Sequence, residues 1–260
     1  MPPGMPLDET LARRDDHEKA AEAAYEAGRL LLHLRDRAPA GTSGERLGDD
    51  GDVGANRLIL DLLAAGFPDD AVLSEEAVDS GSRLGSERVW IVDPLDGTRE
   101  YSEDRKDWAV HVALSVGGVL AAGAVALPAR DLLLSTGGTG PTGATRPPLD
   151  GRPPKMVVSR SRPHPVTTRI GLALGAVLEP VGSAGAKAMA VVLGEADIYA
   201  HDGGMYEWDN AAPAAVAASA GLWVSRLDGR SLRYNQADPW SPDILICRPE
   251  LASAALAAVG

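Results

Sequence analysis

The chain has 260 residues, of which 45% are hydrophobic, so it can bury the core of one large or two small domains and is too apolar to be disordered over most of its length. Acidic residues outnumber basic residues by 37 to 25, and the formal net charge is −12. No basic stripe stands out against that excess, which excludes a nucleic-acid polymer as a partner.

The first half is predicted to contain two helices followed by strands. Apolar and alanine residues recur at helical spacing over 11–37, and Pro39-Ala40-Gly41 ends this helix. We expect a polar loop over 48–51 and a second helix over 53–65. The expected strands cover 71–73, 89–93, 108–116, 119–127, 132–135 and 156–159. A two-residue hairpin turn at Gly117-Gly118 would join the third and fourth of these strands.

The second half alternates between the two kinds of element. The Gly- and Pro-rich segment 137–154 is interpreted as a linker or long crossover. Helices are expected over 166–174, 186–193, 210–220 and 250–258, and strands over 176–181, 197–200 and 243–247. This alternation indicates a layered α/β fold. We divide the chain into an N-terminal α+β domain over 1–148 and a C-terminal α/β domain over 149–260.

Cysteine content and hydropathy bear on the cellular compartment. Cys247 is the only cysteine, which excludes an internal disulfide framework and a zinc ribbon. Residues 1–16 have no apolar core of signal-peptide length, and no apolar run approaches the length of a membrane span. We therefore expect a cytoplasmic protein with no membrane partner.

The strand at 89–93 runs into Asp93-Pro94-Leu95-Asp96-Gly97-Thr98. Two carboxylates held close together at a turn raise each other's pKa unless a cation lies between them. Oxygen ligands with no His or Cys nearby favour Mg²⁺ or Mn²⁺ over zinc. The turn is therefore predicted to be the floor of a magnesium site.

Further acidic residues stand at the ends of other predicted elements. Glu75 and Glu76 follow the short strand at 71–73, where a solvated turn is the ordinary interpretation. If two neighbouring strands end in carboxylates at one sheet edge, however, a metal is needed to compensate the charge. Asp52 and Asp209 each precede a predicted helix and suit an N-cap. The position of Asp209 would also project its carboxylate into a cleft between the two halves.

Two other patterns leave alternatives open. Gly182-Ser183 lies before a helix that carries Lys187 one turn in, which makes a plausible phosphate cradle but falls short of a P-loop. Haloacid-dehalogenase phosphatases also end a strand in Asp-x-Asp-Gly-Thr and use the first Asp as a nucleophile. Here the spacing is one residue longer and includes Pro94, which changes the side chains that share a face.

Taken together, these motifs resemble the inositol monophosphatase superfamily of lithium-sensitive, magnesium-dependent phosphatases. The residues that carry the resemblance are Leu73-Ser74-Glu75-Glu76, Asp93-Pro94-Leu95-Asp96-Gly97-Thr98, Gly182-Ser183 with Lys187, and Trp208-Asp209-Asn210-Ala211-Ala212. Other segments are most similar to CysQ-type 3′(2′),5′-bisphosphate nucleotidases of high-GC bacteria. These segments are Thr98-Arg99-Glu100-Tyr101, Ser159-Arg160-Ser161-Arg162 and Gly204-Met205-Tyr206-Glu207-Trp208-Asp209.

The resemblance implies a layered α-β-α-β-α sandwich of the inositol monophosphatase and fructose-1,6-bisphosphatase type, with the site between the halves. It implies one Mg²⁺ on Glu75, Asp93 and the Leu95 carbonyl, and a second on Asp93, Asp96 and Asp209. A third, weaker ion would lie near Glu75 and Asp52, and Mn²⁺ could replace Mg²⁺. The chain departs from the family pattern over 48–52, which reads Gly-Asp-Asp-Gly-Asp.

The resemblance also implies the catalytic and substrate-binding roles. Thr98, oriented by Asp52, would position or deprotonate the attacking water, and Glu75 would act beside them. The residues implied to contact substrate are Glu75, Leu95, Asp96, Gly97, Thr98, Ser183, Lys187, Asp209 and Arg160, with Arg162 as a further candidate for the distal phosphate. Trp90, Trp108, Trp208, Trp223 and Trp240 are attributed to packing, and none is assigned to a base.

The leading hypothesis is removal of the 3′-phosphate from adenosine 3′,5′-bisphosphate, and from its sulfated relative, in sulfate assimilation. Inositol 1-phosphate and fructose 1,6-bisphosphate are the near alternatives, since the metal chemistry is shared and only the leaving group differs. A remoter alternative is a metal-binding module that has lost turnover. A homodimer is expected from the resemblance alone.

Overall fold

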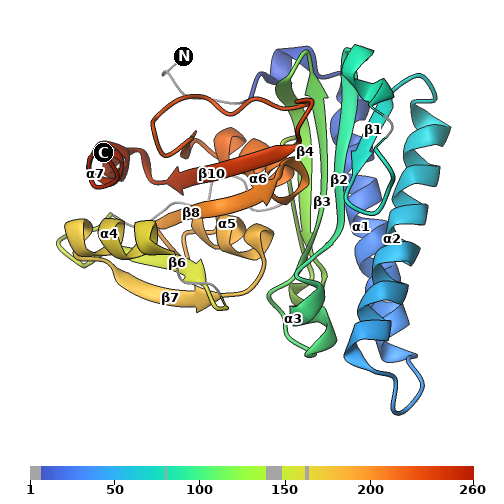
Figure 1. The fold of residues 1–260 in the computed structure, drawn as a ribbon, viewed down its shortest axis with the longest axis horizontal. Coiled ribbons are helices and arrows are strands. Elements are labelled where there is room, and N and C mark those ends of the chain that lie inside the picture. The colour runs from blue at the N-terminus through green and yellow to red at the C-terminus, as the bar shows by residue number, and fades with distance from the viewer. Residues whose placement is uncertain (1–6, 80, 139–147, 162–163) are drawn as a thin grey trace.

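A computed structural model of the chain describes residues 7–79, 81–138, 148–161 and 164–260. Its elements stack in five layers: a helix pair, a sheet, a second helix pair, a second sheet and a third helix pair (Figure 1). This arrangement confirms the predicted α-β-α-β-α sandwich. Among the described residues, no helix is both long and apolar enough to cross a membrane.

The first layer consists of α1 (Arg14–Asp36) and α2 (Gly44–Gly66), which pack on each other and on the first sheet. The loop expected over 48–51 is wrong, because α2 runs through it from an N-cap at Ser43. Gly48 and Gly51 mark close packing here and do not interrupt the helix. A Cβ on Gly48 would lie 2.5 Å from Cγ2 of Thr98, and one on Gly51 would lie 3.1 Å from Leu31.

The first sheet has the order β1-β2-β3-β4-β5. Its strands are β1 (Ala71–Ser74), β2 (Arg88–Asp96), β3 (Ala109–Val116), β4 (Val119–Leu127) and β5 (Leu132–Ser135). The strands β1 and β2 are parallel, with Ser74 opposite Val92, so both end at one edge of the sheet. Gly117 and Gly118 have φ of 58° and 79°, which confirms the two-residue hairpin turn.

The second sheet has the order β7-β6-β8-β10-β9. Its strands are β6 (Lys155–Ser159), β7 (Val177–Val181), β8 (Ile198–Tyr206), β9 (Trp223–Ser225) and β10 (Trp240–Cys247). The strand expected over 197–200 continues to Tyr206, and the three-residue β9 was not predicted. The helices α4 (Pro165–Leu174) and α7 (Pro249–Ala257) form the outer layer of this half (Figure 1).

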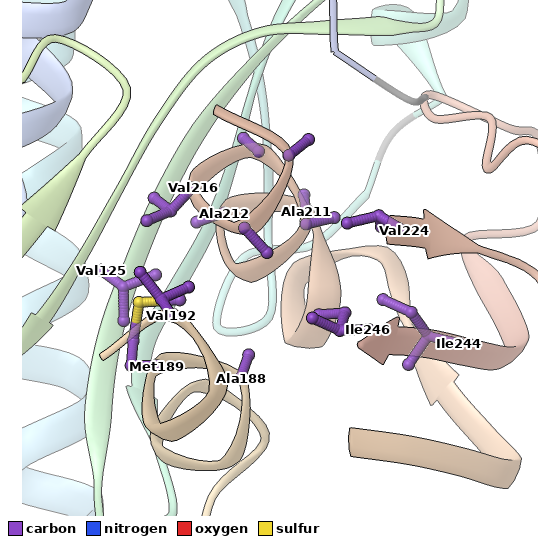
Figure 2. Packing of buried hydrophobic residues seen from close by; sticks show 14 of the residues in the cluster. Val125, Ala188, Met189, Val192, Ala211, Ala212, Val216, Val224, Ile244 and Ile246 are labelled. Atoms are coloured by element: carbon purple, nitrogen blue, oxygen red, sulfur yellow. The ribbon is translucent and has the colours of Figure 1, made fainter. Parts of the chain in front are cut away.

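The middle layer consists of α5 (Ala184–Val192) and α6 (Glu207–Ser219), packed between the two sheets. Figure 2 shows the core at this layer, with side chains from β4, α5, α6, β9 and β10: Val125, Ala188, Met189, Val192, Ala211, Ala212, Val216, Val224, Ile244 and Ile246. Alanine predominates on α6, and this lets the helix lie close to both sheets. The helix begins two residues before Asp209, so the N-cap expected at Asp209 is wrong.

One cluster of buried residues runs from Leu73 and Ile91 in the first sheet, through the middle helices, to Val157 and Ile244 in the second. The division into domains 1–148 and 149–260 stays a prediction. Its boundary adjoins residues 139–147, so part of the predicted linker lies outside the described residues.

The contact between β4 and α6 provides a test of this packing. A Cβ on Gly123 would lie 2.8 Å from Cβ of Ala215 and 3.5 Å from Cα of Ala212, and neither atom can move without the helix. Gly123→Val is therefore expected to lower the free energy of unfolding by about 1–3 kcal/mol, the usual cost of overpacking. Urea unfolding measures this change. Gly85→Ala is the control, since nothing lies within 4 Å of a Cβ there, and an equal loss in both variants would contradict the argument.

Candidate active site

The end of β2 delivers two carboxylates to the edge of the first sheet. Asp93 and Asp96 are 1% and 8% exposed, and Oδ1 of Asp93 accepts a hydrogen bond from the Leu95 amide at 3.1 Å. Gly97 follows with φ of 91°, and a Cβ on it would lie 2.9 Å from Cβ of Ser183. Only glycine suits this position, because both the backbone conformation and the close approach to Ser183 exclude a side chain. The short helix α3 (Thr98–Ser102) starts directly afterwards.

Asp209 reaches the same place from α6. Asp93, Asp96 and Asp209 each offer a carboxylate oxygen, and these atoms lie within 4.8 Å of one another. The position of Asp209 is set by its own helix start, because Oδ2 accepts a hydrogen bond of 2.5 Å from the Tyr206 amide. Burial and then the charge of Asp96 raise the pKa of Asp209 to about 6.

Glu75, which follows β1, completes the cluster. Its amide donates to the Val92 carbonyl at 3.2 Å, which ties the end of β1 to β2. Although the residue keeps an exposed surface, the lost hydration of its carboxyl group and the charges of Asp209 and Asp96 raise its pKa to about 7. Burial, then Glu75, then Asp96 hold the pKa of Asp93 well above its ordinary value. The structure thus brings the four acidic residues into one neighbourhood.

This donor set fits a hard divalent cation. All of its members are carboxylates, the ligands that Mg²⁺ and Mn²⁺ prefer. The raised pKa values of Glu75, Asp93 and Asp209 show that the ionised cluster is unfavourable by itself. A divalent cation would remove that cost by neutralising the charges.

Asp96 differs from the other carboxylates because it is bonded to the start of α5. Its oxygens accept from the amides of Ala184 at 3.2 Å and Gly185 at 2.6 Å. Burial alone would raise the pKa of Asp96, but the adjacent His111 ring and then the hydrogen bond from the Gly185 amide outweigh burial and hold the pKa below its ordinary value. Asp96 is therefore the member of the cluster that stays ionised most readily.

His111 was not among the predicted site residues. It lies on β3, fully buried, with Nε2 3.2 Å from Asp96 and Nδ1 3.1 Å from the Trp208 carbonyl. It thus connects the β2 carboxylate to the first turn of α6. The signal was a polar residue in the otherwise apolar run 109–114, and the partner of such a residue is set by sheet packing and not by local sequence.

Thr98 and Asp52 form the predicted pair. Oγ1 of Thr98 lies 3.3 Å from Oδ2 of Asp52 and 3.2 Å from the Leu95 carbonyl oxygen. Asp52 lies within α2 and not at its N-cap as expected, so the helix itself presents the carboxylate to α3. Burial, followed by the charges of Glu76 and Glu75, raises the pKa of Asp52 to about 7.

The start of α5 holds the other predicted phosphate contacts. Ser183 is the N-cap and accepts a 3.0 Å hydrogen bond from the Ala186 amide. The Lys187 ammonium donates to the carbonyls of Gly182 and Ser183, and burial lowers its pKa to about 8. These carbonyl contacts make Lys187 part of the wall of the site.

Arg160 is committed elsewhere. Its Nη2 donates to Glu100 at 2.7 Å and Glu103 at 2.8 Å, and it is not among the described residues that line the cleft. Arg162 lies outside the described residues. Arg99 lines the cleft instead, and it was not among the predicted substrate contacts.

A cleft of about 630 Å³ opens beside the carboxylates. Its lining includes Asp96, Gly97, Ser183, Lys187, Tyr206, Asp209 and Trp240. Trp90 and Trp108 are fully buried, as predicted, but Trp240 is 46% exposed. Trp240 is therefore not a core residue, because β10 places its side chain in the cleft wall.

Without divalent metal, Asp93→Asn should stabilise the folded protein at neutral pH. The folded state keeps a proton on Asp93 to higher pH than the unfolded chain does. The stability that comes from the protonated Asp93 is fully present below the pKa of about 4 that Asp has in the unfolded chain. It is lost as the pH rises through the pKa of Asp93 in the folded protein. In chelator, the variant's Tm should exceed that of the wild type by roughly 2–4 °C or more near neutral pH, and the gain should shrink towards about pH 4.

Thermal unfolding with and without Mg²⁺ measures these shifts. Added Mg²⁺ should raise the Tm of the wild type more than that of Asp93→Asn. Asp61→Asn, a change on the exposed face of α2, is the control and should stay within about 0.5 kcal/mol of the wild type. Destabilisation of Asp93→Asn by the same amount at every pH would refute the repulsion argument.

Comparison with known proteins agrees with this geometry. The model of the inositol monophosphatase family matches residues 17–259. The chain is 48% identical over 255 residues to a 3′-phosphoadenosine 5′-phosphate phosphatase of Mycobacterium leprae, covering 93% of this chain and 92% of that one. It is 50% identical over 241 residues to a protein of the same name from Mycobacterium tuberculosis, covering 90% and 89%.

A solved structure shows the same fold. The crystal structure of CysQ from Bacteroides thetaiotaomicron, a bacterial member of the inositol monophosphatase family, superposes with a TM-score of 0.77. That match has 26% sequence identity and covers 92% of this chain and 98% of the other. The haloacid-dehalogenase alternative is therefore excluded. The sequence match and the layered architecture lead to one conclusion: the chain belongs to the inositol monophosphatase family.

Proposed function

We propose that this chain is a magnesium-dependent phosphatase that removes the 3′-phosphate of adenosine 3′,5′-bisphosphate and of its sulfated relative, as part of sulfate assimilation. The observation that carries the proposal is the convergence of Asp93, Asp96 and Asp209 at one edge of a cleft. Relatives about half identical over most of the chain are named 3′-phosphoadenosine 5′-phosphate phosphatase, which supports the choice of substrate.

Two or three Mg²⁺ ions would be held by carboxylates and one carbonyl, with Mn²⁺ as a possible substitute. Their ligands would be Glu75, Asp93, Asp96 and Asp209, with the Leu95 carbonyl, and with Asp52 near a third ion. When bound, the ions would supply positive charge that activates water and neutralises the phosphoryl oxygens.

Thr98 and Asp52 would orient the attacking water and accept its proton. The Thr98 hydroxyl lies within hydrogen-bonding distance of Asp52. A carboxyl group whose pKa is about 7 exchanges a proton readily near neutral pH. Water, and not Asp93, would then be the nucleophile, so we expect no aspartyl-phosphate in a single turnover.

Main-chain groups would bind the phosphate. The amides of Gly97 and Thr98 lie at the start of α3, where first-turn amides have no partner within the helix. Ser183 lies against Gly97 at the start of α5 and would contact the phosphate from the opposite side. Asp209 would face the leaving oxygen. A small phosphorylated substrate is thus the proposed partner, and the homodimer stays a prediction.

Substrate choice is tested by side-by-side hydrolysis. We expect kcat/KM for adenosine 3′,5′-bisphosphate to exceed that for inositol 1-phosphate and for fructose 1,6-bisphosphate by about tenfold or more. Phosphate release with Mg²⁺ measures it, and chelator should abolish it. Equal or faster hydrolysis of inositol 1-phosphate would contradict the nucleotidase assignment and favour an inositol 1-phosphate phosphatase. Nucleotide binding without any release would favour a non-catalytic module.

The role of Thr98 is tested by Thr98→Val, which keeps the shape of the side chain but removes the hydroxyl. We expect kcat to fall about 10²–10⁴-fold, the usual contribution of a positioned proton acceptor, with little change in KM. Thr98→Ser is the control and should retain most of the activity. If Thr98→Val keeps wild-type kcat, the hydroxyl has no part in the reaction.

A further inference from the structure

Three aromatic side chains form a cluster at the edge of the cleft, close to the carboxylates. The rings of Tyr206 and Trp208 stack at 4.6 Å with 12° between their planes. Trp240 meets Tyr206 edge to face at 5.5 Å and 84°. Tyr206 and Trp240 are 42% and 46% exposed, and both line the cleft.

The backbone holds this cluster in place. Tyr206 and Trp240 are cross-strand partners at the joined ends of β8 and β10. Gly204 has φ of 95°, and a Cβ on it would lie 1.7 Å from Cη2 of Trp240. Because Gly204 has no side chain, the indole can lie directly over the β8 backbone. A rigid aromatic surface loses little conformational entropy when it binds a ligand.

The cluster lies where a ligand attached to the scissile phosphate must extend. The Tyr206 amide donates to the Asp209 carboxylate, three residues further along the chain. The aromatic cluster and the acidic cluster therefore meet at the start of α6. In adenosine 3′,5′-bisphosphate the base and the 3′-phosphate are carried by the same ribose ring. A site for the base must therefore lie within about one sugar ring of the carboxylates.

The other ring-bearing residues among the described lining residues, Tyr199 and His201, are less exposed than Tyr206 and Trp240. Among the described lining residues, the other large aromatic side chain is Tyr199, which is 1% exposed and lies beneath the Lys187 ammonium. A single exposed apolar residue is ordinary. Here two exposed aromatic rings line one cleft, and a third ring packs against one of them. Packing of the hydrophobic core does not account for their exposed positions.

We propose that Tyr206 and Trp240 form a stacking platform for the base of the nucleotide, and that this platform makes the enzyme prefer nucleotides to base-free phosphate esters. The inference rests on the proposed function. Stacking of a base on an aromatic side chain contributes roughly 5- to 150-fold to affinity. Stacking depends on the area of the aromatic base, so purine nucleotides should bind more tightly than pyrimidine nucleotides.

The experiment compares two substrates that differ only in the base. One is adenosine 3′,5′-bisphosphate, and the other is 1,4-anhydroribitol 3,5-bisphosphate, which has hydrogen in place of the base. Trp240→Leu and Tyr206→Leu should each lower kcat/KM for the nucleotide about tenfold or more, mainly through KM, and change kcat/KM for the base-free compound less than about twofold. Trp240→Phe should keep most of the activity, because a phenyl ring still stacks.

The matched control is Tyr25→Leu. Tyr25 is also 46% exposed but lies on α1, on the far side of the first sheet from the cleft. It should leave kcat/KM for both substrates unchanged. A binding measurement guards against a variant that does not fold: adenosine 5′-monophosphate with Mg²⁺ should quench tryptophan fluorescence in the wild type, and the quench should be largely lost in Trp240→Phe.

The outcomes separate the two claims. Failure of the wild type to hydrolyse adenosine 3′,5′-bisphosphate would overturn the proposed function, and the platform with it. If the wild type hydrolyses the nucleotide but Trp240→Leu and Tyr206→Leu lose activity equally on both substrates, the aromatic residues shape the cleft or contact the sugar, and the platform is overturned alone. Wild-type rates in both variants, or no quench by the mononucleotide, would overturn it as well.

Discussion

Mutual repulsion among buried carboxylates is the constraint on which the rest of this structure depends. Asp93 lies on β2 of the first sheet and Asp209 on α6 of the middle layer, yet their oxygens approach to a distance at which ionised groups raise each other's pKa. Such a cluster persists only when packing elsewhere holds its members in place. Burying these ionised carboxylates therefore costs free energy of folding. Packing of the layered core offsets this cost, and a bound cation would remove it.

The positions of the carboxylates are set by close contacts between layers. At Gly48 the helix α2 lies directly against Thr98, and this contact brings Asp52 within reach of the Thr98 hydroxyl. At Gly185 a Cβ would lie 2.1 Å from His111, so α5 can direct its first amides at Asp96 only because no side chain is present. Small residues at these contacts therefore serve the chemistry as much as the packing.

The two sides of the cleft have different physical characters. The acidic edge carries negative charge that a metal cation would neutralise, whereas the β8–β10 end carries exposed aromatic surface at Tyr206 and Trp240. Asp209 and Tyr206 belong to one turn, joined by a hydrogen bond. A single helix start thus places both a charged group and an apolar surface towards the same bound molecule, which is how one site can combine hydrolysis with selection of a leaving group.

The sequence by itself determined the layered α/β fold, most of the helices and strands, and the acidic residues of the site, because hydrophobic periodicity and motif spacing are local properties. The sequence-based predictions failed where a local rule was overridden by tertiary packing. Glycines over 48–51 suggested a loop but lie inside α2, and β9 is too short to leave a pattern. Only the tertiary structure decided that His111 lies against Asp96, that Arg160 pairs with Glu100, and that Trp240 is exposed. Each of these features depends on which distant segment of the chain packs against the residue. The spacing of residues along the sequence does not specify that segment directly.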